Sequence, residues 1–362
     1  MRINIFTPPK FHKSPLDIEY LNRLTQKEWH YTTSGKASIY HILKDLELDT
    51  ILVPIYICDT ILEPLKRLNI VPIFYDIETM DLNNSLKSIK KQFEIYNSKA
   101  ILVASMYGNP ANLVEIEKYC HDNEIFMIDD SAQSFGAKLE NRYVGTFGDA
   151  GFFSFSTGKP TAGHMGSFFW SKNNINIKRK RHCFIHYFRW LDFYYNRYRI
   201  YDNIPFILKR TINLFSRFQL KLTDISNDDI CNFEKEIIGG ILLDNINGNF
   251  DFRENYIKSF ISKFKKSSYF RIIEPIRGIA NRHKFILLFN SKDIAKNFIK
   301  YMQEFSIYAS NGYTLLSKDL EALPNAKEIN KKVVELPVED DKEKMKYLFE
   351  KVEKFEYKNI KR

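Results

Sequence analysis

The sequence predicts an α/β protein with a mostly parallel sheet in a large domain and a smaller C-terminal α+β domain. Three observations support this prediction. The first half alternates short apolar runs with amphipathic runs, as expected for parallel strands joined by helices. The chain has 362 residues, which is long for one compact domain. One apolar run ends in two carboxylates, at the position where open α/β sheets place their ligand sites.

The expected elements of the first half follow one another with short connections. Strands are expected at 50–55, 70–77, 99–107, 124–130 and 148–156. Helices are expected at 37–46, 60–68, 85–96 and 112–123. Asn112 is a suitable N-cap for the last of these helices, because its side chain can accept a hydrogen bond from a free backbone N–H.

The second half is less regular. Residues 178–222 are expected to be largely helical and aromatic, and an α+β unit is expected from about residue 231. Its expected elements are 233–246, 250–266, 283–290 and 342–355. We therefore predict a large domain over 1–230, which includes the segment 178–222, and a small domain over 231–362.

The composition is that of a globular protein, with 44% apolar and 15% aromatic residues. Cys58, Cys120, Cys183 and Cys231 are too widely spaced for a zinc motif or a dense disulfide framework, which favours a reducing cytosol and no bound metal. The N-terminus lacks the apolar core of a signal peptide, and there is no apolar run of about 18 residues. We expect a cytoplasmic protein that does not span a membrane.

Most of the net charge of +10 lies in residues 178–222, which hold eleven Lys and Arg against two Asp. We favour an amphipathic helical element packed on the same chain or on a dimer mate, with its basic stems over apolar surface. The same charge could bind a nucleotide diphosphate or a membrane surface peripherally. No nucleic-acid-binding pattern accompanies it, so we expect no nucleic-acid partner.

Three motifs carry the chemistry: "TTSGKASIYHIL", "MIDDSAQSFGA" and "VGTFGDAGFFSFSTGK". Taken alone, Asp130 and Lys159 are a weak pair: a salt bridge or a solvated lysine is as good an interpretation as a functional site. Together, however, the motifs resemble the DegT-type sugar aminotransferases, a pyridoxal-phosphate-dependent family with the aspartate aminotransferase fold, fold type I. "MYGNPANLVEIEKYC" and "ALPNAKEINKKVVELPV" extend the resemblance along most of the chain.

The resemblance implies a role for four residues of the two later motifs. Lys159 would bind the cofactor as a Schiff base and move the proton during transamination. Asp130 would pair with the pyridinium nitrogen and keep it protonated. Gln133 would lie near the phenolic oxygen of the cofactor, and Ser154 would bind its phosphate.

Further cofactor contacts are expected at two places upstream. Gly35 and Lys36 would bind the phosphate, since backbone N–H groups at a helix start form an anion site, although an ordinary turn is the alternative. Tyr56 or Cys58 would stack on the ring. We favour Tyr56 for its aromatic face, but a shift of one or two positions along the strand would change the choice.

The sequence departs from the family pattern in places. Lys36 stands where the family usually has Thr or a small residue, and His164 stands where an acidic residue is usual, in a run that is one residue shorter. The Asn-x-Arg element, whose Asn reaches the phosphate of the neighbouring subunit, is not found. Asn227 in "DISNDDICNF" is the candidate for that contact.

The resemblance implies an aminotransferase that converts a nucleotide-linked keto sugar to an amino sugar for surface polysaccharide, with glutamate as donor, working as a homodimer. It leaves open whether C3 or C4 is aminated. One alternative is another enzyme on the same scaffold, either of the aminohydroxybenzoate type or a dehydratase. Dehydratases of this group typically have His in place of the lysine, which Lys159 argues against. Another alternative is a catalytically silent protein that binds a membrane surface.

Overall fold

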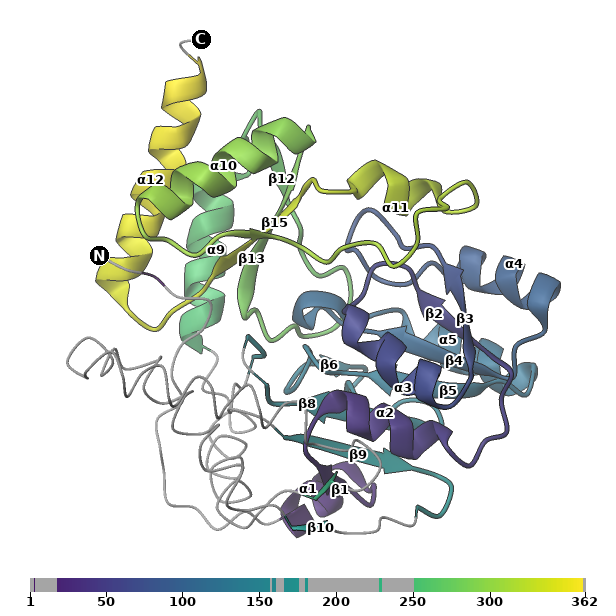
Figure 1. Ribbon diagram of the computed structural model, residues 1–362. Helices are drawn as coiled ribbons and strands as arrows, with labels where there is room; N and C mark the ends of the chain where they lie inside the picture. Colours follow the sequence, from purple (N-terminus) through teal and green to yellow (C-terminus); the bar gives the residue numbers. More distant parts are fainter. Residues whose placement is uncertain are drawn as a thin grey trace, which may run out of the picture.

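The structure is a computed structural model, which describes residues 3, 18–156, 158–160, 166–175, 180–181, 228–229 and 251–360. Within these residues the chain forms a large N-terminal domain and a smaller C-terminal domain (Figure 1). The predicted boundary at 230/231 lies outside the described residues. At the other end of the chain, Ile3 pairs with Ile307 and packs into the core of the small domain.

The large domain is built on a seven-stranded sheet. Its strands, in spatial order, are β1 (His30–Thr32), β9 (Ser167–Ser171), β8 (Ala150–Ser154), β5 (Phe126–Asp130), β4 (Ala100–Ala104), β2 (Thr50–Pro54) and β3 (Val71–Tyr75). The five strands from β8 to β3 are parallel to one another, and β9 is antiparallel to both β8 and β1. The expectation of a mostly parallel sheet is therefore confirmed.

Helices cover both faces of this sheet (Figure 1). The helices of one face are α2 (Gly35–Leu43) and α3 (Leu62–Arg67), which follows the 3-10 turn Asp59–Ile61. Those of the other face are α4 (Leu86–Tyr96) and α5 (Leu113–Asp122), and α1 (Ile18–Thr25) packs near the β1 edge. Because successive side chains of a strand point to opposite faces, Leu102 and Val103 of β4 enter different cores.

Two predicted details differ from the structure after β4 and before α5. The predicted strand 99–107 ends at Ala104, because Met106–Gly108 form a 3-10 turn in which Tyr107 has φ 56°. Asn112 is the N-cap residue of α5, as expected, but its side chain makes no capping bond. The Asn112 amide donates to Glu115 instead.

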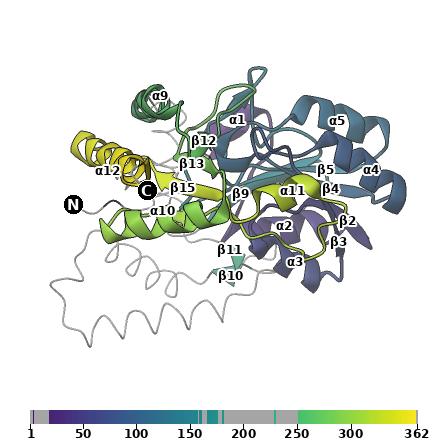
Figure 2. The same cartoon turned by 90° about the horizontal axis from the view of Figure 1, so that it is seen from above.

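The small domain is a four-stranded antiparallel sheet with helices on one face. Its strands, in spatial order, are β12 (Phe270–Ile272), β13 (Lys284–Phe289), β15 (Val333–Pro337) and β14 (Ser310–Asn311). Its covering helices are α9 (Asp251–Phe264), α10 (Lys292–Glu304) and α12 (Lys342–Ile360). Figure 2 shows these helices on the side of the sheet away from the large domain.

The other face of the small sheet packs against the large domain. Ile286 of β13 and Val333 of β15 share a core with Leu102 of the large sheet. The short helix α11 (Pro324–Ile329) joins this core and is pinned by the buried carboxylate of Asp76, which accepts a hydrogen bond from the Ala326 N–H at 2.8 Å. The two domains are thus joined by apolar packing and by a buried polar contact.

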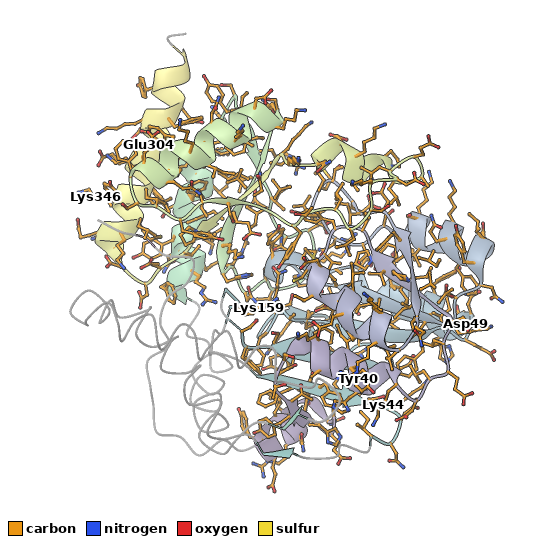
Figure 3. All side chains as sticks on the ribbon, in the orientation of Figure 1. Tyr40, Lys44, Asp49, Lys159, Glu304 and Lys346 are labelled. Carbon is orange, nitrogen blue, oxygen red and sulfur yellow. The ribbon has the colours of Figure 1, made fainter. Side chains whose placement is uncertain are left out.

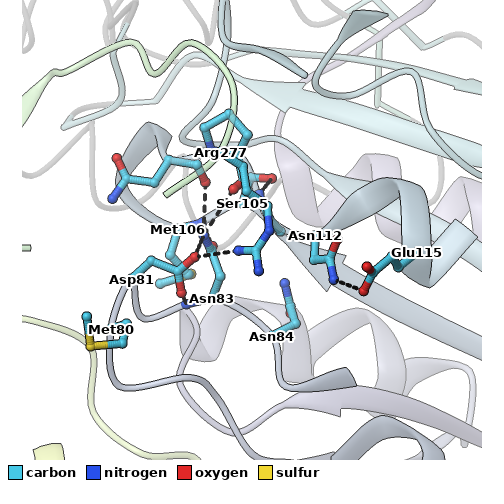
Figure 4. Close-up of polar contacts among 12 residues, drawn as sticks. Met80, Asp81, Asn83, Asn84, Ser105, Met106, Asn112, Glu115 and Arg277 are labelled. Carbon is cyan, nitrogen blue, oxygen red and sulfur yellow. Dashed lines mark hydrogen bonds and ion pairs between the residues drawn. The ribbon is translucent and has the colours of Figure 1, made fainter. Parts of the chain in front are cut away.

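A second polar network joins the domains beside this core (Figure 4). The buried carboxylate of Asp81 forms an ion pair with Arg277 at 3.1 Å and accepts a hydrogen bond from the Asn83 N–H at the same distance. The Asn83 side chain in turn accepts a hydrogen bond from the Met106 N–H at 2.8 Å. This network fixes the segment after β4, which leads into the candidate site.

Two smaller strand pairs complete the described structure. β6 (Lys138–Leu139) and β7 (Arg142–Tyr143) form a hairpin, and β10 (Lys180–Arg181) pairs with β11 (Asp228–Asp229). The helices that the structure describes include no segment long and apolar enough to cross a membrane.

Candidate active site

A cavity of about 520 Å³ lies between the two domains. Its large-domain wall is formed by the carboxyl ends of β4, β5 and β8 and by the start of α2, and its small-domain wall by residues of β13, β14 and β15. Figure 3 shows Lys159 at this junction, below the small domain. The carboxyl edge of the sheet is where such folds bind ligands, as the sequence predicted.

Asp129 and Asp130, the last residues of β5, point to opposite sides of the sheet. Asp129 is fully buried, and its carboxylate accepts hydrogen bonds from the N–H groups of Gly145 at 2.6 Å and Phe147 at 3.2 Å. Burial raises the pKa of Asp129 to about 7, although these hydrogen bonds oppose the shift. Asp129 is thus occupied in holding the "GTFGD" turn against β5, and Asp130 is left to line the cavity.

Asp130 and Lys159 face the same cavity. Burial raises the pKa of the Asp130 carboxyl to about 6, and a hydrogen bond from the Ala132 N–H and the charge of Lys159 oppose the shift. Burial also lowers the pKa of the half-buried Lys159 amine below its ordinary value of 10.5. The site therefore holds a carboxylate beside an amine that loses its proton more easily than an exposed lysine does.

The segment that carries Lys159 is fixed by contacts from two directions. The Lys159 N–H donates to the Ser156 carbonyl at 3.2 Å and closes a turn after β8. The buried guanidinium of Arg253, on α9, donates to the Pro160 carbonyl at 2.8 Å. The small domain thus helps to hold the lysine at the cavity.

The start of α2 faces the same cavity through Ser34, Gly35 and Lys36. Ser34 is the N-cap, and its hydroxyl accepts a hydrogen bond from the Ala37 N–H at 3.3 Å. A Cβ on Gly35 would lie 3.2 Å from the Phe152 ring, so the glycine lets the helix start approach β8 closely. A helix N-terminus bordered by Ser154 and Ser156 of the cavity wall is suited to a phosphate.

Gln133 is held in place by both ends of its side chain. Its amide oxygen accepts a hydrogen bond from the Tyr107 N–H at 3.1 Å, and its amide nitrogen donates to the Tyr313 hydroxyl at 2.7 Å. Tyr107 has a left-handed backbone in the 3-10 turn that follows β4. Tyr313 comes from the small domain and lines the cavity with Gln133, so this pair bridges the two domains at the site.

The structure places Tyr56 and Cys58, the two candidates for the ring-stacking residue, differently with respect to the cavity. Tyr56 is buried, does not line the cavity, and shares a hydrogen bond of 2.6 Å with the Tyr107 hydroxyl. The alternative, Cys58, does line the cavity. β2 ends at Pro54, so strand alternation does not extend to these positions and could not decide between them.

Sequence reasoning missed the small-domain wall of the cavity. Lys284 of β13 and Glu335 of β15 line it, as does Tyr313. A charged residue inside the otherwise apolar run "VVELP" was the one signal in the sequence for Glu335. Nothing in the sequence indicated that these strands approach the motifs of the large domain.

The remaining predicted site residues divide into two groups. Lys36 lines the cavity, and its ammonium forms an ion pair with Glu63 at 2.6 Å. Asn227, His164 and all of the basic segment 178–222 except residues 180–181 lie outside the described residues.

The residues around the cavity fit pyridoxal phosphate. An amine, a buried carboxylate, a helix start and two serine hydroxyls meet there, which are the groups that hold its aldehyde, ring nitrogen and phosphate. Searched within the described residues, the structure shows no cluster of His, Cys, Asp or Glu that could bind a metal ion.

Comparison with known families agrees with the motifs. Residues 31–186 match the model of the DegT/DnrJ/EryC1/StrS aminotransferase family, so the resemblance is confirmed over this segment.

Curated relatives match over limited lengths. A GDP-perosamine synthase of Escherichia coli O157:H7 is 32% identical over 121 residues, which is 33% of each chain. A GDP-4-keto-6-deoxy-D-mannose 3-dehydratase of Escherichia coli O55:H7 is 36% identical over 106 residues, 29% of this chain and 27% of the relative. The chain thus spans about a third of the length of these relatives.

Solved structures match over nearly the whole fold. An aminotransferase, TlmJ, from Streptoalloteichus hindustanus aligns with a TM-score of 0.76 at 14% identity, covering 98% of each chain. An E. coli GDP-4-keto-6-deoxy-D-mannose-3-dehydratase with bound hydrated PLP aligns with a TM-score of 0.69 at 19% identity, covering 96% of this chain and 92% of the other. These alignments confirm the predicted fold.

Proposed function

We propose, from the match of residues 31–186 to the model of the DegT/DnrJ/EryC1/StrS aminotransferase family, that the chain is a pyridoxal-phosphate-dependent aminotransferase. Its acceptor is a nucleotide-linked keto sugar, and its product is an amino sugar. One observation carries the proposal: Lys159 and Asp130 face a single cavity together with the start of a helix.

The predicted site residues that line the cavity have different tasks in this reaction. Pyridoxal phosphate, when bound, supplies the electron sink that lets a proton leave the carbon bearing the amino group. Asp130 would hold a proton on the ring nitrogen, because it is the acidic residue among the described residues of the large-domain wall. The start of α2 and Ser154 would bind the phosphate. Gln133, held by the Tyr107 N–H, would lie beside the ring.

Lys159 acts as both nucleophile and proton carrier. Burial lowers the pKa of its amine, which increases the fraction of neutral amine at physiological pH. Once the donor amino acid has displaced it, the freed amine would move the proton from the donor carbon to the cofactor, and the donor would leave as its 2-oxo acid. In the second half the same amine would move a proton from the cofactor to the sugar carbon that receives the amino group, and the carbonyl oxygen would leave as water. One amine would therefore serve both halves.

The substrate class rests on the relatives. GDP-perosamine synthase and a UDP-N-acetyl-3-dehydro-alpha-D-glucosamine 3-aminotransferase from Acidithiobacillus ferrooxidans are named for nucleotide sugars. We extend that substrate class to this chain, with glutamate as the amino donor. The amino sugar that it makes is used for surface polysaccharide. The dehydratase alternative is less favoured because a lysine, not a histidine, occupies position 159.

The neighbouring-subunit contact and the homodimer are part of the proposal. The family's site lies at a subunit interface, and Asn227 is the proposed partner-subunit contact to the phosphate. An active species that sediments as a monomer would contradict this part of the proposal.

The proposal is tested by adding pyridoxal phosphate to the purified protein. We expect a yellow chromophore in the wild type and in Lys172→Ala, a control whose ion pair with Asp149 lies away from the cavity. Lys159→Ala should give no such chromophore. The wild type should then release 2-oxoglutarate from glutamate when supplied with a nucleotide-linked keto sugar. Protein that takes up no cofactor would instead favour a silent scaffold.

A further inference from the structure

Lys284 and Glu335 form a buried ion pair on the small-domain wall of the cavity. The Lys284 ammonium lies 2.6 Å from a Glu335 carboxylate oxygen, and their side chains are 6% and 8% exposed. In the sheet register Lys284 is opposite Pro337 and Ile286 is opposite Glu335, so the two side chains are diagonal neighbours on one face. Both line the cavity that holds Lys159.

Stability alone does not account for this pair. Desolvating two charges costs about as much as their attraction returns, and apolar side chains of similar size often serve equally well. Of the neighbouring positions on this face of the sheet, Ile286 and Val333 are apolar, and Ser310, opposite Glu335, is polar and lines the cavity. A charged pair kept at the cavity wall, where apolar side chains would serve stability equally well, therefore indicates contact with a polar ligand.

The ammonium has hydrogen-bonding capacity to spare. A lysine ammonium carries three N–H donors, and among the described residues Lys284 makes one hydrogen bond, to Glu335. Glu335 fixes the position of the ammonium and supplies its counter-charge. The remaining donors are available to a molecule in the cavity.

The other cations of the cavity wall have separate tasks. Of the described residues that line it, Lys36, Lys159 and Lys284 are the basic ones, and neither arginine nor histidine is among them. Lys36 is paired with Glu63 beside the helix start that suits a phosphate. Lys159 carries the reaction. Lys284 is thus the cation left for an anionic group next to the reacting carbon.

We propose that Lys284, positioned by Glu335, binds the α-carboxylate of the amino-acid donor. The inference rests on the proposed function, because an α-amino acid is the donor of that reaction. Its carboxylate is one bond from the carbon that gives up the proton to Lys159. All three side chains line one cavity. Burial is the main cause that lowers the pKa of the Lys159 amine; Lys284 adds to this effect and Glu335 opposes it, as expected for groups on the same cavity wall.

The first test measures binding without turnover. Glutarate, which has the carboxylates of the donor but no amine, is titrated by calorimetry into the cofactor-free protein. Because Lys284→Met alone would leave Glu335 buried without a cation, the variant is Lys284→Met/Glu335→Gln. We expect its affinity for glutarate to fall roughly 10- to 150-fold, as for loss of a charge-assisted hydrogen bond.

A matched control uses the exposed pair Lys354–Glu350, whose atoms also lie 2.6 Å apart. Lys354→Met/Glu350→Gln should leave glutarate binding unchanged. Unchanged glutarate binding in Lys284→Met/Glu335→Gln would overturn the inference. The same holds if that variant loses affinity only for a nucleoside diphosphate, because the pair would then bind the sugar substrate.

The second test compares two donors in the cofactor-loaded protein. 4-Aminobutyrate matches glutamate but lacks the α-carboxylate. Wild type should bleach the yellow chromophore faster with glutamate, and the Lys284→Met/Glu335→Gln variant should lose most of this discrimination. Full discrimination in the variant would overturn the inference, whereas wild type that reacts with neither amine would overturn the proposed function itself.

Discussion

Asp129 and Asp130 are chemically identical neighbours whose positions on one strand give them different tasks. The pleat of β5 turns Asp129 toward the "GTFGD" turn and Asp130 toward the cavity. Burial raises the pKa of both carboxyls, to about 7 and about 6. The Ala132 N–H and the charge of Lys159 offset part of the cost of an ionised Asp130, and a cationic ring nitrogen beside it would offset more.

We expect Asp130→Asn to stabilise the cofactor-free protein, increasingly so as pH rises. Burial raises the pKa of Asp130 from 3.8 to about 6 in the folded state, so between these values the folded state binds more protons than the unfolded state. Ionisation then costs the folded state about 1 kcal/mol at about pH 4.5 and about 3 kcal/mol above about pH 7. Asn avoids this cost and keeps an acceptor for the Ala132 N–H.

Urea unfolding of the cofactor-free wild type and variant at these pH values measures the difference. The cofactor-loaded variant should at the same time lose activity. A stability difference that does not grow with pH would show that the Asp130 carboxyl is not titrating in this range.

The start of α2 shows how one element contributes a binding site through its backbone. Its first N–H groups have no partner inside the helix, and its dipole favours a negative charge. Ser34 caps the helix, and the missing side chain of Gly35 allows the close approach to β8. Stability and phosphate binding therefore depend on the same few residues.

We expect Ser34→Ala to weaken both folding and cofactor binding. Ser34 and Ser291 are equivalent N-caps, of α2 and α10, with capping distances of 3.3 Å and 3.2 Å. Loss of either should reduce the free energy of unfolding by about 1 kcal/mol. Only Ser34→Ala should also raise the dissociation constant of pyridoxal phosphate, about 2- to 5-fold. If both variants changed the dissociation constant of the cofactor equally, the N-cap of α2 would have no specific role in cofactor binding.

The elements of the large domain could be predicted because each one shows its pattern locally. Apolar runs such as 50–55 and 124–130 are buried strands, and amphipathic runs such as 85–96 are helices. Prediction was weaker where the chain leaves regular structure. The run 99–107 continues apolar past Ala104, but the turn at Tyr107 directs its N–H to Gln133, a contact that no local pattern encodes.

At the scale of the whole molecule, the site exists because two domains close on one cavity. The motif residues of the large domain were accessible to sequence reasoning, since they occur close together within short stretches of the sequence. Lys284, Tyr313 and Glu335 were not, because they reach the cavity through the packing of the small sheet against the large domain. Tertiary contacts such as the Asp81–Arg277 ion pair hold the small domain against the large domain (Figure 4).

We expect Arg277→Met to destabilise the protein and Arg277→Met/Asp81→Asn to recover most of the loss. The Asp81 side chain is 1% exposed, so removing Arg277 leaves a buried carboxylate without its cation, at a cost of about 3 kcal/mol. Asn removes that charge but keeps an acceptor for the Asn83 N–H. Urea unfolding compares the three proteins, and a double variant no more stable than Arg277→Met would show that the charge of Asp81 is not the cause.

The most direct test of the central claim is to identify the lysine that binds the cofactor. Among the residues that the structure describes, the lysines that line the cavity are Lys36, Lys159 and Lys284. The protein loaded with pyridoxal phosphate is reduced with borohydride, digested, and mapped by mass spectrometry. The account predicts a pyridoxyl group on Lys159. A label on Lys36 or Lys284 instead, or no label on any of the three, would contradict it.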